Sequence, residues 1–268
     1  MYPEDIRITL IQTDIKWEDT AQNLKILQNI ILSEVSGTDL IILPECFTTG
    51  FTMNQDDYAV TMDSKPIQWM KDMVGEKQSA ITGTLLIKEN DKFYNRLIFI
   101  NKSKNVSFYD KRHLFKMKGE ESNLSQGKGR LIVKTGQWRI CPLICYDLRF
   151  PVWSRYRDDY DILIYSANWP AARDDIWNTL LKARAIENMS YVIGVNRIGT
   201  DGYNISYSGN SSIYDPHGKL RARLSKDKEE TGTFTLSLTE LNNMREKFPV
   251  HLDADDFKII TEPEKNKF

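Results

Sequence analysis

The sequence has few of the residues that most often carry enzyme chemistry, with three cysteines and three histidines among 268 residues. An odd and sparse set of cysteines excludes a disulfide framework. Cys141 and Cys145 have C-x3-C spacing, but no second Cys/His pair follows at the spacing of zinc ligands, so we expect no metal site. So few histidines also disfavour a Ser/His/Asp or Cys/His arrangement. A nucleophile in this chain is expected to use a base other than imidazole.

The sequence also lacks an excess of charge of one sign and long apolar runs. Its 36 Lys and Arg balance 37 Asp and Glu, for a formal net charge of −1. Near-neutrality removes the electrostatic argument for nucleic acid or an anionic membrane as a partner. No apolar run approaches the roughly 18–20 residues of a membrane span, and the acidic start MYPEDIRITL is unlike a signal peptide. We therefore expect a globular protein of the cytoplasm.

Short apolar runs alternate with amphipathic segments along the chain. Periodicity predicts helices at Thr20–Glu34, Pro66–Val74, Asp174–Ser190 and Thr239–Lys247, with a further helix near Val152–Arg157. It predicts strands at Ile6–Gln12, Asp39–Leu43, Ser79–Ile87, Phe93–Asn101, Asn105–Tyr109, Arg130–Thr135, Trp138–Ile144, Asp161–Ser166, Tyr191–Arg197, Ser208–Tyr214, Leu220–Leu224 and Gly232–Leu238. The mixture of βαβ units and strand pairs favours an α/β fold with parallel and antiparallel sheet. No Pro/Gly/Ser-rich linker divides the chain, so we expect residues 1–268 to form a single domain.

Three reactive side chains stand directly after predicted strands, namely Glu45, Lys111 and Cys145. Ligand sites in open α/β sheets lie outside the carboxyl ends of the strands. A carboxylate at such a position suits a general base, and an ammonium group there stabilises an oxyanion. A thiol at a strand-to-helix turn suits a nucleophile.

Each of these three residues has a simpler explanation when it is taken alone. Glu45 would anchor a loop or cap a helix, and Lys111 would be a solvated surface group. Cys145 would be a small buried hydrophobe, which is what we expect of Cys141 inside its strand. The occurrence of all three at strand ends, in this chain order, favours a catalytic set.

The surrounding segments resemble the nitrilase superfamily, whose Glu–Lys–Cys catalytic set occurs in this order. Leu-Pro-Glu-Cys-Phe, Tyr-Asp-Lys-Arg-His-Leu-Phe and Cys-Tyr-Asp-Leu-Arg-Phe-Pro are similar to its omega-amidase branch, particularly the bacterial members. Ser-Ala-Asn-Trp-Pro, Lys-Ala-Arg-Ala-Ile-Glu-Asn and Arg-Glu-Lys-Phe-Pro extend the resemblance, which covers Ile6 to about Phe257. The fold it implies is a four-layer α-β-β-α sandwich.

The resemblance implies a role for each catalytic residue. Cys145 would be the nucleophile that forms a thioester, Glu45 the general base and Lys111 the oxyanion stabiliser. The family often has a second glutamate after the lysine segment, for which Glu120 and Glu121 are candidates, and Glu120 matches the family spacing. Flanked by carboxylates, Lys111 is expected to stay charged and to lower the pKa of the Cys145 thiol.

The resemblance also implies a substrate with an amide at one end and a 2-oxo acid at the other, such as 2-oxoglutaramate or 2-oxosuccinamate. Its products would be the dicarboxylate and ammonia. A cation should meet the substrate carboxylate, and Arg149 is a candidate through a bidentate contact. An ion pair of Arg149 with Asp147 or Glu187 is an equal alternative.

Aromatic side chains near the three segments are candidates for the wall of the substrate pocket: Phe47, Tyr146 and Trp169. A core position is an equal alternative for each of them. This chemistry requires no metal or organic cofactor, and the resemblance implies a homodimer.

Two rival readings remain open at this point. Within the family, the substrate would be another small amide, a carbamoyl compound or a nitrile. In a different class, the chain would be a non-catalytic small-molecule binding protein that keeps the fold. A Rossmann dinucleotide-binding protein is disfavoured because no G-x-G-x-x-G follows the first strand.

Overall fold

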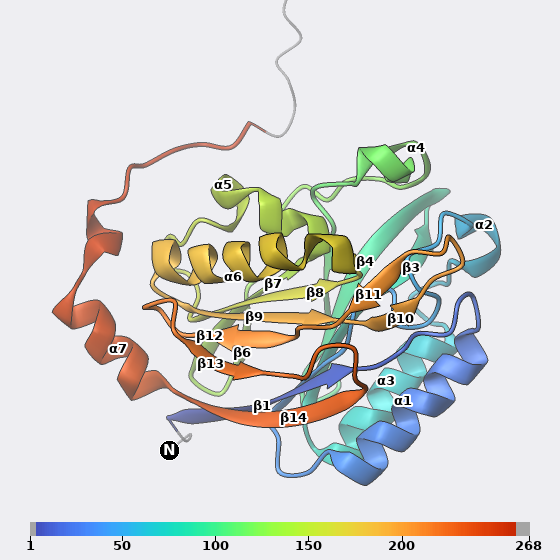
Figure 1. Cartoon of the computed structure of the whole chain (residues 1–268), viewed down its shortest axis with the longest axis horizontal. Coiled ribbons are helices and arrows are strands. Elements are labelled where there is room, and N and C mark those ends of the chain that lie inside the picture. Colours follow the sequence, from blue (N-terminus) through green and yellow to red (C-terminus); the bar gives the residue numbers. More distant parts are fainter. Residues whose placement is uncertain (1–3, 261–268) are drawn as a thin grey trace, which may run out of the picture.

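Two six-stranded sheets lie at the centre of the protein, between outer layers of helices (Figure 1). The computed structural model describes residues 4–260. The first sheet has the order β14 (Glu230–Ser237), β1 (Asp5–Gln12), β2 (Leu40–Ile42), β3 (Ala80–Glu89), β4 (Lys92–Ile100), β5 (Val106–Asp110). The second has the order β13 (Leu220–Arg223), β12 (Ser212–Tyr214), β9 (Tyr191–Asn196), β8 (Ile162–Ala167), β7 (Trp138–Ile144), β6 (Val133–Thr135).

Each sheet has a parallel centre and antiparallel edges. In the first sheet β1, β2 and β3 are parallel neighbours, and β14, β4 and β5 pair antiparallel. In the second sheet β7, β8 and β9 are parallel, and β6, β12 and β13 pair antiparallel. The expected mixture of parallel and antiparallel sheet is confirmed.

The helices form the outer layers. The helices α1 (Thr20–Glu34) and α3 (Lys65–Lys77) cover the first sheet, and α6 (Asp174–Asn188) covers the second, with α7 (Leu238–Lys247) at its side (Figure 1). The expected four-layer α-β-β-α sandwich is therefore confirmed. Short elements connect these layers: α2 (Gln55–Tyr58), η1 (Lys116–Lys118), α4 (Glu120–Asn123), η2 (Cys145–Arg149), α5 (Pro151–Ser154), η3 (Ala171–Arg173), β10 (Ile198–Thr200), β11 (Ser206–Ser208) and η4 (Val250–Asp253).

Alternation along the strands divides the apolar side chains between two cores. On β2, Leu40 and Ile42 belong to the core between the sheets, whereas Ile41 belongs to the core under α1 and α3. Successive side chains of a strand point to opposite faces, so a wholly apolar strand fills both cores. This is why the short run around residues 40–42 is entirely buried.

Most predicted elements are confirmed to within a few residues, and α1 has the predicted bounds. The expected strand Ser208–Tyr214 is divided between the end of β11 and β12, with an irregular turn between them. The helix expected near Val152–Arg157 is the short α5, which ends at Ser154, and the 3₁₀ element η2 precedes it. Within residues 4–260, none of the helices has the length and apolar character needed to cross a membrane.

Candidate active site

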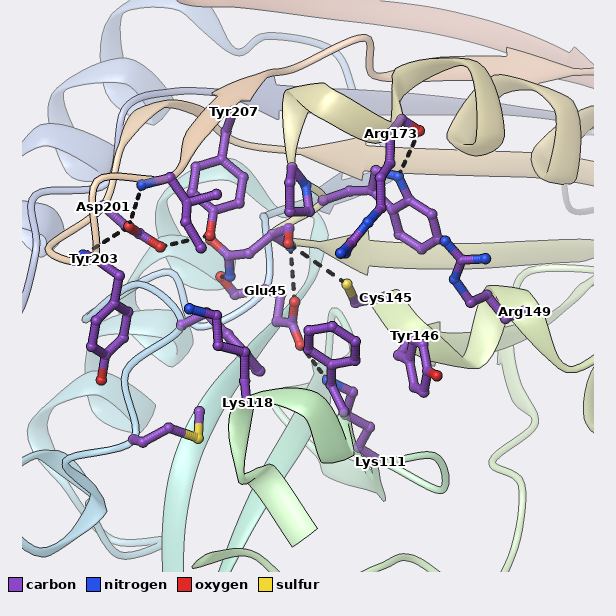
Figure 2. Close-up of a pocket in the computed structure, with 17 residues that line it drawn as sticks. Glu45, Lys111, Lys118, Cys145, Tyr146, Arg149, Arg173, Asp201, Tyr203 and Tyr207 are labelled. Atoms are coloured by element: carbon purple, nitrogen blue, oxygen red, sulfur yellow. Dashed lines mark hydrogen bonds and ion pairs between the residues drawn. The ribbon is translucent and has the colours of Figure 1, made fainter.

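The side chains of Glu45, Lys111 and Cys145 meet in one cavity of about 270 Å³ (Figure 2). Glu45 follows β2 and Lys111 follows β5 in the first sheet, whereas Cys145 follows β7 in the second. Lys111 Nζ lies 2.9 Å from Glu45 Oε1. The three residues that the sequence singled out are thus brought together from both sheets.

Cys145 occupies a strained turn at the end of β7. Its φ of 39° lies in the left-handed region. This conformation costs a residue other than glycine about 1–3 kcal/mol, and residues that adopt it occur mainly at functional sites. Asp147 fixes the turn because its carboxylate accepts a hydrogen bond from the Ile144 N–H at 3.1 Å. The Sγ atom lies 3.9 Å from the carbonyl oxygen of Asn168, and the residue is 9% exposed at the cavity. The turn therefore presents the thiol to the pocket.

Lys111 is buried between two carboxylates. Its Nζ donates to Glu45 at 2.9 Å and to Glu120 at 3.0 Å. Burial lowers the pKa of Lys111, but the charges of Glu120 and Glu45 outweigh this effect and raise the pKa well above its usual value. A third contact joins Lys111 Nζ to the other oxygen of Glu120, Oε2, at 3.1 Å. The ammonium group is therefore charged, as expected, and is held by both carboxylates at the edge of the cavity.

Glu120 is the buried glutamate of the pair considered from the sequence. Its oxygens accept hydrogen bonds from Lys111, from Asn95 and from the Phe115 N–H. Burial raises the pKa of Glu120, although the neighbouring ammonium lowers it. Glu121 is partly exposed and pairs instead with Lys116 at 2.9 Å.

Lys111 lowers the pKa of the Cys145 thiol, as expected, but other effects determine the net shift. Burial and the adjacent Glu45 charge raise the pKa of the thiol well above its usual value, and the lowering effect of Lys111 is smaller. A buried thiolate next to a carboxylate is unfavourable. The resting group is therefore a neutral thiol, and a base must remove its proton during attack.

The candidate pocket-wall residues divide into two groups. Tyr146, Trp169 and Arg149 line the cavity. Phe47 does not: it lies in the core beneath α3, with its ring centre 5.8 Å from that of Trp69. The ring packs over Gly83, where an added Cβ would lie 2.9 Å from Phe47 Cδ1. The expectation that Phe47 lines the pocket is therefore wrong. Gly83 has no side chain, which leaves room for the Phe47 ring in the core.

Three cations line the cavity without a carboxylate partner among residues 4–260. Arg149 lies over the Trp169 ring at 5.0 Å, and Arg173 lies over Phe115 at 5.6 Å. Lys118 lies 5.0 Å from the ring of Tyr203. In Figure 2 the Arg173 side chain reaches down into the cavity above Cys145, and Arg149 lies to its side.

The two carboxylates that were alternative partners for Arg149 contact other residues. Asp147 contacts His113 at 2.8 Å, and Glu187 pairs with Arg184 at 3.1 Å. Arg149 is thus left facing the pocket.

Several residues at the site had no signal in the sequence. They come from loops and short elements and line the cavity: Phe51, Met53, Lys118, Arg173, Asp201, Tyr203, Ile205 and Tyr207. Phe115, Asn168 and Pro170 lie in segments that carry the resemblance, and Asn95 lies in the predicted strand β4, but the sequence assigned none of these four residues to the site. Among the described residues no group of three or more His, Cys, Asp or Glu is arranged to hold a metal ion.

A buried carboxylate, an ammonium group and a thiol beside an apolar cavity, at the strand ends of an α-β-β-α sandwich, define a hydrolase with a covalent thiol mechanism. The carbon–nitrogen hydrolase family model matches residues 7–246. The chain therefore belongs to the carbon–nitrogen hydrolase family, whose members hydrolyse carbon–nitrogen bonds.

Relatives of known structure or name support this assignment. The chain is 41% identical to the omega-amidase YafV of Escherichia coli over 254 residues, covering 95% of this chain and 98% of that protein. It is 32% identical to the 2-oxoglutaramate amidase of Bacillus subtilis, covering 92% and 96%. The crystal structure of XC1258 from Xanthomonas campestris, a CN-hydrolase superfamily protein with an arsenic adduct in its active site, has a TM-score of 0.93 and 38% identity, covering 96% of this chain and all of that chain.

Proposed function

We propose that the protein is an omega-amidase. It hydrolyses the terminal amide of a small 2-oxo acid, 2-oxoglutaramate or 2-oxosuccinamate, to the dicarboxylate and ammonia. The names of the Escherichia coli and Bacillus subtilis relatives support this substrate class. The observation that carries the proposal is the cluster of unpaired cations around a pocket that also holds the thiol.

The proposed reaction has two chemical steps. Glu45 takes the Cys145 proton while the sulfur attacks the amide carbon, and Lys111 stabilises the oxyanion together with a backbone N–H near Tyr146. The tetrahedral adduct collapses to a thioester when Glu45 returns the proton to the departing nitrogen, which leaves as ammonia. Glu45 then removes a proton from water, which attacks the thioester. The carbon–sulfur bond breaks, the acid is released, and Glu45 returns the proton to the Cys145 sulfur. Glu120 helps to hold Lys111 in place.

The cations supply recognition at the other end of the substrate. A 2-oxo acid amide carries one carboxylate, and guanidinium groups bind carboxylates through two parallel hydrogen bonds. The guanidinium groups of Arg149 and Arg173 lie over the rings of Trp169 and Phe115, and this stacking orients them. We assign the substrate carboxylate to these two arginines. Tyr146 and Trp169 form the wall against the carbon chain.

The same reasoning extends to the whole protein. We propose that residues 1–268 act as one catalytic domain, since both sheets contribute to the pocket. We place the enzyme in the cytoplasm because a catalytic thiol must stay reduced.

We also propose a homodimer, since large apolar side chains are exposed at one hollow or next in sequence to residues that line it. Val152 is 56% exposed, Ile186 46% and Leu252 75%. Val152 borders the same hollow as Glu187 and the segment of residues 253–257. Exposed apolar surface of this kind marks a protein–protein contact, and a second copy of the chain is the partner that we propose for it.

Steady-state kinetics test the proposed function. We expect ammonia release from 2-oxoglutaramate and 2-oxosuccinamate, with much lower kcat/KM for glutamine, asparagine, carbamoyl compounds and nitriles. Cys145→Ala should abolish turnover with the fold intact. Arg173→Leu and Arg149→Leu should each raise KM for the 2-oxo acid amides by about 10- to 100-fold, the worth of a charge-assisted contact.

The control for the arginine variants is an uncharged amide of similar length, whose kinetics should change little. A preference of the wild-type enzyme for glutamine, asparagine or a nitrile would refute the substrate assignment. Ammonia release by Cys145→Ala would refute the nucleophile.

A further inference from the structure

Asn95 lies between the two buried glutamates and contacts both. It is on β4 and is 1% exposed. Its side-chain Nδ2 donates to Glu45 Oε1 at 2.8 Å and to Glu120 Oε1 at 3.3 Å. Its backbone carbonyl accepts a hydrogen bond from the Lys111 N–H at 3.0 Å. One residue therefore touches the proposed base, the second glutamate and the backbone of the lysine.

The two oxygens of Glu45 are not equivalent. Oε1 accepts from Lys111 Nζ at 2.9 Å and from Asn95 at 2.8 Å, which uses both of its lone pairs. Oε2 accepts one hydrogen bond, from the Asn168 N–H at 2.8 Å. A lone pair on Oε2 is left to take a proton.

The orientation of the Asn95 amide is fixed by its surroundings. If the amide were rotated, its carbonyl oxygen would face two carboxylate oxygens, and all three groups would be acceptors. In the observed orientation Oδ1 is buried and has no hydrogen-bond partner among the described residues. A buried acceptor without a partner is unfavourable, so what retains asparagine here is the donor end of its side chain.

From this geometry we propose that Asn95 is a positioning residue. Its amide occupies Oε1 of Glu45 and thereby makes Oε2 the oxygen that exchanges protons with Cys145, the leaving nitrogen and water. The amide also separates two negative charges that share one ammonium group. The proposal rests on the role of Glu45 as the base in the proposed function.

The experiment replaces Asn95 by leucine, which is similar in size and cannot donate. The titratable groups that face Glu45 are Lys111, Glu120 and Cys145, together with Cys46, which follows Glu45 in the chain. Hydrogen bonds to a carboxylate favour its charged form, and Asn95→Leu removes one from Glu45 and one from Glu120. We expect kcat to fall about tenfold or more, KM to change little, and the acidic limb of the pH profile of kcat/KM to move to higher pH.

A second variant, Glu120→Gln, distinguishes a positioning role of Asn95 from a packing role. In Glu120→Gln the repulsion between the carboxylates is gone, so adding Asn95→Leu should shift the acidic limb less than it does in the wild-type background. The matched control is Thr82→Val on β3, which removes a buried hydrogen bond to the Ile98 carbonyl in the same sheet and contacts neither glutamate. It should leave the pH profile unchanged.

An unshifted acidic limb in Asn95→Leu would overturn the proposal, whatever the loss of activity. If Asn95→Leu does not fold, Asn95→Asp decides: its carboxyl group can donate only when protonated, so relative activity should rise as the pH falls. A fixed ratio to wild type across the pH range would also refute the assignment.

The rate at which methyl methanethiosulfonate modifies Cys145 gives a readout without substrate. The pH profile of this rate should move in the same direction in Asn95→Leu as the profile of kcat/KM. If no 2-oxo acid amide is hydrolysed, the substrate proposal fails, and this modification profile still decides the role of Asn95.

Discussion

At the scale of single residues, Cys145 combines a strained backbone with a thiol that is hard to ionise. The left-handed φ directs the side chain into the pocket, and burial beside Glu45 keeps the sulfur protonated at rest. Catalysis then depends on removing the proton as the new bond forms, which is the work of a base within reach. The lysine contributes more to the oxyanion than to the thiolate.

The reactivity of Cys145 with methyl methanethiosulfonate reports this raised pKa. Because the thiol pKa is well above its usual value of about 8.5, the modification rate should still be rising above pH 9. Mass spectrometry should find one adduct, since Cys46 and Cys141 are fully buried, and Cys145→Ala should take up none. A plateau reached below pH 8 would contradict a resting neutral thiol.

The sequence identified the residues with reactive groups but not those that orient them. Glu45, Lys111 and Cys145 each follow an apolar strand, which is a local signal. Asn95 sits inside a strand and acquires its role through Glu45 and Glu120, which are far away in the chain. Local sequence does not encode such contacts.

At the scale of elements, long helices and strands with a regular apolar period are predicted from the sequence more accurately than short ones. The sequence predicts both ends of α1 because Leu24, Leu27, Ile30 and Ile31 recur at helical spacing. The strands β10 and β11 were not separately predicted, since each has three residues and mixes polar and apolar side chains. Their turn nevertheless supplies Asp201 and Tyr203 to the pocket, so the least predictable elements shape specificity.

The helix α7 is tied to the second sheet by a buried ion network. Arg245 donates to Asp161 at 2.8 Å and to the Ser190 hydroxyl at 2.9 Å. Arg139 donates to the same aspartate at 2.8 Å. Burial raises the pKa of Asp161, but the hydrogen bonds from Arg139 outweigh it and lower the pKa below its usual value.

We expect Asp161→Asn to lower the free energy of unfolding by about 3 kcal/mol at neutral pH, because two arginines lose their counter-charge. Since the folded-state pKa is lowered, the stabilisation is fully present above about pH 4 and is lost as the pH falls through the folded value. Urea unfolding at several pH values measures this. The exposed neighbour Asp158→Asn is the control, with an expected change below about 1 kcal/mol. Equal effects of the two variants would contradict a buried network.

At the scale of the whole molecule, the pocket exists only where the two sheets meet. The first sheet brings the proposed base and the ammonium group, and the second brings the proposed nucleophile. Neither half of the chain alone carries the catalytic set.

The proposed dimer is tested by charging its apolar face. Ile186→Asp should convert a dimer to a monomer in light scattering after gel filtration, because an unpaired carboxylate disfavours burial. The matched control is Leu32→Asp on α1, which is 44% exposed, similar to the 46% of Ile186, on the helix layer of the other sheet. It should leave the mass unchanged. A monomeric wild-type protein, or a dimer that tolerates Ile186→Asp, would rule out this face.

The distribution of charge in the cavity affects how the substrate and the product of the proposed reaction bind. Glu45 and Glu120 share the single ammonium group of Lys111, whereas Arg149, Arg173 and Lys118 line the cavity without a carboxylate partner among the described residues. An uncharged carboxamide is accepted beside the glutamates, but the carboxylate formed from it is repelled there. The proposed hydrolysis therefore replaces an uncharged group beside the glutamates by a charged one, which weakens product binding and favours product release.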